Sequence, residues 1–210
     1  MIAQRKITAG IVASVVIIGL KLWEGIFLFQ TTKFQILGSF SSKQIINSII
    51  LYSCYIATWV VIKDILVVGY GLGQFNKNIR WFIQLMAASA VSTLFSWFFA
   101  VEYARLVLGL TGILSLIFFL IIFVQLTKVD TKESPPIRIL RSFMILLLVT
   151  SFVGSFLKNF GDLQRYFDAM RNWPDIGLFA YFIVTIPYIF LALFFVRAGK
   201  QLNSAPPRVG

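Results

Sequence analysis

The stretch from Trp81 to Thr127 constrains the fold more than any other part of the chain. Over these 47 residues the only charged side chains are Glu102 and Arg105, and both lie near the middle. One crossing of a bilayer needs roughly 20 apolar residues, so the stretch is long enough for two crossings. We therefore predict a helical hairpin with its tip at residues 101–105.

The composition of the whole chain extends this interpretation. The 210 residues are 59% hydrophobic and 13% charged, and the mean hydropathy is +0.86. Soluble domains carry about 25% charged residues. A water-soluble core could not enclose so many apolar side chains, so lipid must be the solvent and helices must satisfy the backbone. We expect an all-α, polytopic helical membrane protein, multi-pass, in a cell or inner membrane.

Six transmembrane helices are predicted, forming a single bundle. They cover residues 7–29, 44–68, 81–99, 106–127, 139–157 and 176–196. The glycines at 69–73 should end the second span, because glycine readily takes the left-handed conformation. Pro187 should kink the sixth span. We further expect a polar loop at 75–80, a break at Pro135-Pro136, an interfacial amphipathic helix at 163–170 and a flexible basic tail at 198–210.

The basic residues between the spans predict the orientation. Eleven Lys and Arg lie on the side of the termini and six on the other side. The positive-inside rule therefore places both termini in the cytoplasm. The net charge of +11 then comes from short basic loops, so we expect anionic lipid head groups rather than nucleic acid at this face.

Lys63 and Asp64 are the deepest charges in the predicted spans. Ionisable residues inside a membrane are costly and are functional-site hypotheses. Neighbouring helix positions point about 100° apart, so we expect separate partners for the two side chains. Either both lie in the cytoplasmic head groups, or they are buried against water, backbone carbonyls or another chain. Lys21 and Glu24, one turn apart, are expected to pair near the opposite interface.

Small and hydroxyl-bearing residues mark the predicted hairpin. The third span carries Ala88, Ser89, Ser92, Thr93 and Ser96, and the fourth carries Gly109, Gly112 and Ser115. Small residues at such spacing let helices approach closely, and hydroxyls can bond across the interface. The pattern predicts either tight packing of the hairpin or a polar path between its two helices.

Two short patterns resemble known transport proteins. Residues 68–71, Val-Gly-Tyr-Gly, resemble part of the potassium-channel selectivity filter, in which backbone carbonyls replace the water of the ion. Val67 and Leu72 depart from that pattern. Ala9 and Ala13 resemble the Ala-x-x-x-Ala pattern with which vitamin-capturing subunits of certain importers dock a partner. These resemblances imply a channel or a substrate-capturing subunit.

Enzymatic residues are sparse. The chain has no histidine, one cysteine (Cys54) and eight acidic residues. No two carboxylates share a span at helical spacing, so we expect no catalytic, metal or cofactor site. The sequence favours an accessory or assembly subunit that contacts partner subunits or forms a homo-oligomer. The alternative is a carrier or channel for a small solute or ion.

Overall fold

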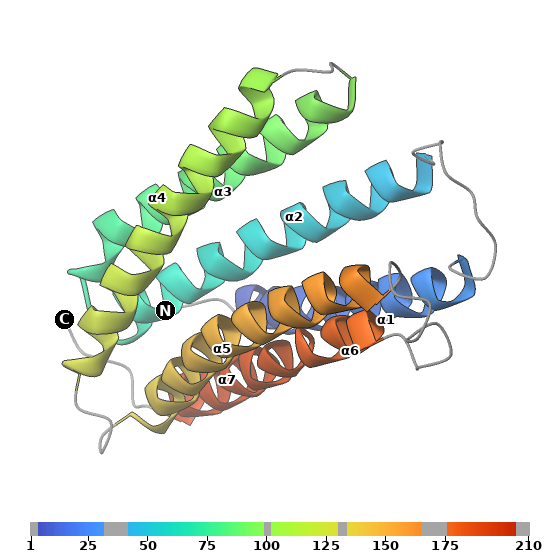
Figure 1. Cartoon of the computed structure of the whole chain (residues 1–210). Coiled ribbons are helices and arrows are strands. Elements are labelled where there is room, and N and C mark those ends of the chain that lie inside the picture. The colour runs from blue at the N-terminus through green and yellow to red at the C-terminus, as the bar shows by residue number, and fades with distance from the viewer. Residues whose placement is uncertain (1–3, 32–41, 99–101, 130–133, 165–175, 205–210) are drawn as a thin grey trace.

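The computed structural model describes residues 4–31, 42–98, 102–129, 134–164 and 176–204 (Figure 1). These ranges hold helices joined by short turns and contain no strand, which confirms the all-α prediction. The elements are α1 (Gln4–Thr31), α2 (Ser42–Asp64), the π-helical turn η1 (Ile65–Gly69), α3 (Phe75–Phe98), α4 (Glu102–Thr127), α5 (Pro135–Gln164), α6 (Ile176–Ile183) and α7 (Ile186–Ser204).

Five helical stretches within the described ranges are long and apolar enough to cross a membrane. They are Gln4–Gly25, Ile45–Gly69, Leu106–Thr127, Pro135–Leu157 and Phe179–Ser204. Helix α3 is not among them, and its first turns carry Asn76, Lys77, Asn78 and Arg80. These five stretches support a membrane protein. The predicted number of six spans additionally requires α3 to cross the membrane.

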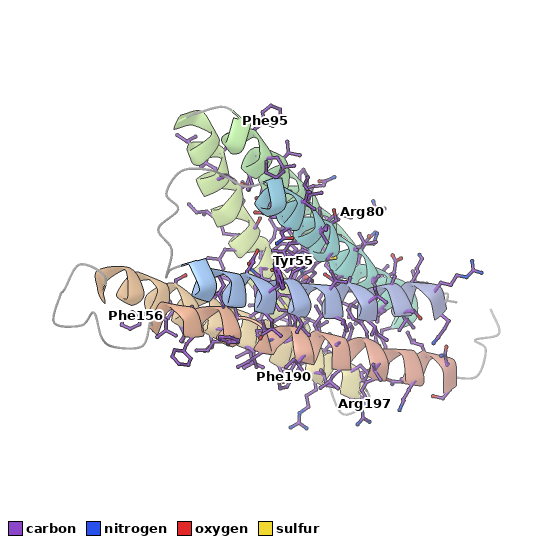
Figure 2. All side chains as sticks on the ribbon, turned by 90° about the vertical axis from the view of Figure 1, so that its right-hand side faces the viewer. Tyr55, Arg80, Phe95, Phe156, Phe190 and Arg197 are labelled. Atoms are coloured by element: carbon purple, nitrogen blue, oxygen red, sulfur yellow. The ribbon has the colours of Figure 1, made fainter. Side chains whose placement is uncertain are left out.

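The helices form a bundle with an attached hairpin. Helix α1 packs against α2, α6 and α7, and α5 packs against α6 and α7. Helices α3 and α4 pack along each other and join the bundle mainly through α2. Both views show this hairpin inclined away from α1, α5 and α7 (Figures 1 and 2). The predicted pairing of the third and fourth apolar runs is thus confirmed.

Close approach of α1 and α7 closes the bundle. A Cβ atom on Gly10 would lie 2.9 Å from the ring of Phe195, and one on Gly199 would lie 3.1 Å from Ile7. Gly10 belongs to a buried stripe of α1 that includes Ile7, Ser14 and Ile17, spaced three or four residues apart. Side chains at the two glycines would therefore separate the helices.

Two predicted connectors are helical instead. Helix α3 begins at Phe75, and the loop predicted at 75–80 is wrong because Phe75, Ile79 and Phe82 form a buried helical stripe. Helix α5 begins at Pro135, so the two prolines start a helix rather than separate two. Proline suits the first turn of a helix, where its missing N–H needs no partner.

The predicted tail is also shorter than expected. Helix α7 continues to Ser204, so residues 198–204 are not a flexible tail. Ala198 and Gly199 are buried, and Asn203 Nδ2 donates to Gln4 Oε1 over 2.8 Å. Polar residues such as Lys200 and Gln201 resemble a tail in the sequence, but they also suit a helical turn at the membrane interface.

The two predicted interruptions are confirmed. Gly71 has a φ of 72°, which ends the second helix as expected of glycine. Residues 184–185 form a turn between α6 and α7, two residues before Pro187. The amphipathic helix predicted at 163–170 lies mostly outside the described residues, and α5 itself continues to Gln164.

Candidate functional site

Asp64 forms an ion-pair network at one end of the bundle. Its Oδ2 lies 2.6 Å from Lys6 Nζ, and its Oδ1 lies 3.7 Å from Lys63 Nζ. Asp64 therefore has the expected separate partner, in Lys6, but it also lies near Lys63, because a long lysine side chain can bend back to its neighbour. Lys6 was missed as a partner because it lies 58 residues away in sequence.

The position of this network favours the head-group interpretation. Lys6 lies in the first turn of α1, and Asp64 is the last residue of the antiparallel α2. The Lys6 side chain is 57% exposed, while those of Lys63 and Asp64 are 21% and 15% exposed. A partly exposed pair at the ends of two helices has access to the polar interface.

Hydroxyl groups connect the hairpin to α2. Ser89 Oγ in α3 donates to Thr111 Oγ1 in α4 over 2.9 Å. Thr93 Oγ1 donates to the Ser89 carbonyl over 2.8 Å and lies 3.2 Å from the Tyr52 hydroxyl in α2. Ser89 and Thr93 thus link three helices, and Thr111 and Tyr52 are the partners that sequence reasoning missed.

The other small residues of the hairpin do not share this pattern of contacts between helices. Ser92 is partly exposed on α3, and the side chain of Ser96 lies outside the described residues. Gly109 and Gly112 face open space, with no atom within 4 Å of an added Cβ. The prediction that these glycines pack the hairpin is therefore wrong. They lie on the part of α4 turned away from α3.

A polar seam crosses the bundle at the level of these hydroxyls. We define it as Thr111, Ser89, Thr93, Tyr52, Tyr55 and Tyr188. The ring centroids of Tyr52 and Tyr55 are 6.4 Å apart, and those of Tyr55 and Tyr188 are 5.7 Å apart. Figure 2 places Tyr55 near the centre of the molecule. The seam therefore runs from α4 through α3 and α2 to α7.

Lys21 and Glu24 form a second ion pair, within α1. The two charged groups are 3.6 Å apart, which confirms the predicted pairing, and their side chains are 22% and 29% exposed. Lys21 lies 15 residues beyond Lys6, or about 22 Å along α1. The two ion pairs are therefore at different depths, and the structure does not join them.

All members of the seam are hydroxyl-bearing side chains. No group of three His, Cys, Asp or Glu side chains that could hold a metal occurs in the part of the chain that the structure describes. Hydrogen bonds between such hydroxyls stabilise helix pairs in lipid.

Residues 68–71 of the first pattern cover the end of the π-helical turn Ile65–Gly69 and the glycine Gly71. The carbonyl of Gly71 accepts the N–H of Gly73 over 3.1 Å. In the Ala-x-x-x-Ala pattern, Ala13 is buried but Ala9 is exposed.

A hollow of about 350 Å³ opens on the first turns of α3. It is lined by Asn76, Lys77, Arg80, Trp81 and Gln84. Trp81 stacks on Phe118 of α4, with ring centroids 6.4 Å apart and an interplanar angle of 22°. All the residues that line the hollow belong to α3, and Trp81 connects it to α4.

The chain matches no protein-family model, no curated protein and no solved structure. Its function is therefore inferred from the helices and side chains described above.

Proposed function

We propose that this chain is a six-span membrane protein with both termini in the cytoplasm, and that it serves as an accessory or assembly subunit of a membrane complex. The observation that carries the proposal is the exposed, almost wholly apolar surface of α4. This surface would bind a transmembrane helix of a partner subunit, and no catalytic step is required of the chain.

Helix α4 is the least enclosed of the apolar helices. In its most apolar stretch 11% of the residues are buried, against 28% in the corresponding stretches of α1, α2 and α5. Its outward face carries Leu106, Ile113, Ile117, Leu120 and Val124, each at least 41% exposed. A helix so apolar on its outer face must be covered by lipid or by another protein.

The two glycines of α4 favour a protein on that surface. Gly109 and Gly112 leave the backbone of α4 bare, with open space where a side chain would be. Bare backbone allows a second helix to approach closely and gain van der Waals contacts, which is the main force between helices in lipid.

The six-span topology includes α3 as a crossing helix. Helices α3 and α4 contain 24 and 26 residues, so they extend over about 36 and 39 Å. Because they pack antiparallel along each other, a crossing by α4 carries α3 with it. The polar residues 76–80 then lie at the cytoplasmic interface, where the positive-inside rule favours them.

Reporter fusions test this topology. Fusions after Gly73 and Pro136 should report the cytoplasm, whereas fusions near Ser39 and Asn172 should report the outside. If Ser39 and Gly73 report the same compartment, α2 does not cross and the six-span proposal fails.

Site-specific photo-crosslinking tests the partner proposal. A photoreactive residue at Ile113 or Ile117 should crosslink a distinct protein in native membranes. The matched controls are Val149 and Phe152 of α5, which are 52% and 77% exposed and should crosslink little protein. Equal protein adducts from both helices, or none from α4, would contradict a partner surface on α4.

A carrier or channel remains the second candidate, and the polar seam is the observation that favours it. A polar path through the bundle is what a small solute or ion would need. Under this proposal the purified chain is a monomer or homo-oligomer that binds a solute without a stoichiometric partner. Replacing Tyr55 by Phe should then weaken binding of the solute. Under the accessory-subunit proposal the same change should leave crosslinking at α4 unaltered.

A further inference from the structure

The geometry points to a binding site for one anionic phospholipid on the outer face of α3, with its phosphate in the hollow at Lys77 and Arg80. This inference rests on the membrane placement proposed above but not on the partner subunit. The site would be a specific one, distinct from general attraction of the basic face to anionic lipid.

The head-group end of the site is positively charged and amide-rich. Lys77 and Arg80 are both exposed and line the hollow together with the side-chain amides of Asn76 and Gln84. Helix α3 contains no Asp or Glu in its whole length. Its two cations are therefore not neutralised by their own helix and can bind a phosphate through charge-assisted hydrogen bonds.

The apolar end of the site continues along the same face of α3. Lys77, Trp81, Gln84, Ala88 and Val91 recur every three or four residues, so they lie in one row, and all five are exposed. The row changes from cationic to aromatic to aliphatic away from the hollow. From Trp81 to Val91 it extends about 15 Å, which is the depth of one leaflet of hydrocarbon.

This row distinguishes a lipid from a free phosphate. A free anion would use the cations and amides alone, whereas a phospholipid also covers Ala88 and Val91 with an acyl chain. Trp81 lies between the two ends, is 50% exposed and is supported by its stacking on Phe118. Tryptophan prefers this depth, where one part of the ring is apolar and its N–H is polar.

Native mass spectrometry of the full chain in mild detergent tests the site. The chain is offered equal amounts of phosphatidylglycerol and phosphatidylcholine with the same acyl chains. We expect one phosphatidylglycerol to be retained in preference to phosphatidylcholine. In the double variant Lys77→Gln/Arg80→Gln the preference should fall by on the order of ten- to thirtyfold, as expected for two basic groups near anionic lipid.

A matched control removes the same charge elsewhere. Arg197 and Lys200 of α7 are exposed and have the same three-residue spacing, and Arg197 lies on the opposite side of the molecule from Arg80 (Figure 2). Arg197→Gln/Lys200→Gln should keep the preference. Equal losses in the two double variants would mean that only net charge matters, and would overturn the site.

The wild-type chain separates lipid from free anion without any substitution. Excess inorganic phosphate should not displace long-chain phosphatidylglycerol, and the dihexanoyl form should bind more weakly because it cannot cover Val91. Displacement by phosphate with no effect of chain length would identify a free-anion site instead. Absence of any preference for phosphatidylglycerol in the wild type would refute the inference, whether or not α4 crosslinks a partner.

Discussion

Replacing Gly10 by alanine should reveal how tightly α1 and α7 are packed. The added Cβ would lie 2.9–3.0 Å from three ring atoms of Phe195, which is fully buried. Alanine favours a helix over glycine by about 1 kcal/mol, whereas inserting a methyl group into a packed interface costs about 1–3 kcal/mol. The two effects oppose each other, so Gly10→Ala alone would be hard to interpret.

Gly19→Ala is the control that removes this ambiguity. Gly19 lies in the same helix, is exposed and has no atom within 4 Å of an added Cβ. The helix-propensity gain is therefore common to both variants, and the difference between them isolates the clash with Phe195. We expect Gly10→Ala to be about 1–3 kcal/mol less stable than Gly19→Ala.

Thermal unfolding in detergent measures this difference. For a chain of this size about 1 kcal/mol corresponds to a shift of about 2–4 °C in Tm, so the two variants should differ by several degrees. Replacing the ring of Phe195 by the smaller leucine, in Gly10→Ala/Phe195→Leu, should recover part of the lost Tm. The two residues are in contact, so the effects of their substitutions are not additive. Equal Tm values for Gly10→Ala and Gly19→Ala would refute the close packing of α1 on α7.

Three further changes test other contacts. Asp64→Asn should lower the free energy of unfolding by at most about 1 kcal/mol, and this loss should be smaller at high salt. A loss above about 3 kcal/mol, measured by denaturation, would instead indicate a buried ion pair. Arg141 donates from Nε to the Leu126 carbonyl over 2.7 Å and from its guanidinium to the Val129 carbonyl, so Arg141→Gln should cost about 1–3 kcal/mol. The exposed Arg138→Gln should cost almost nothing, and equal losses would exclude capping of α4 by Arg141. Burial raises the pKa of Tyr70 from 10.0 to about 12, so the stabilising contribution of Tyr70 is complete below pH 10 and is lost as the pH rises towards 12. In Tyr70→Phe the free energy of unfolding should therefore fall less steeply between pH 10 and 12. An unchanged dependence on pH would contradict the burial of Tyr70.

The coarse fold was predictable because apolar length and helix-ending residues are local signals. The hairpin, the stop at Gly71 and the interruption before Pro187 each follow from a few neighbouring residues. The errors at Phe75 and Pro135 have a common physical origin. A helix that begins at a membrane interface carries polar or proline residues in its first turn, and these resemble a loop when only hydropathy is considered.

The candidate site was less predictable because its contacts join distant parts of the chain. Ser89 and Thr93 could be selected as hydroxyls on an apolar helix, but nothing in the sequence assigns Thr111 or Tyr52 as their partners. Spacing also could not show which face of α4 carries its glycines. Gly10 lies between Ala9 and Ala13, and nothing in that local pattern indicates its close contact with Phe195.

The contact between the first and last helices has a consequence for biosynthesis. Gly10 contacts Phe195, Ile7 contacts Gly199, and Gln4 accepts a hydrogen bond from Asn203. Helices from the two ends of the sequence, α1 and α7, therefore pack against each other. The ribosome makes α7 after all the other helices described here. Until α7 is made, Gly10 and Ile7 lack the contacts that Phe195 and Gly199 supply. Insertion of α1 and its packing against α7 are therefore separate events.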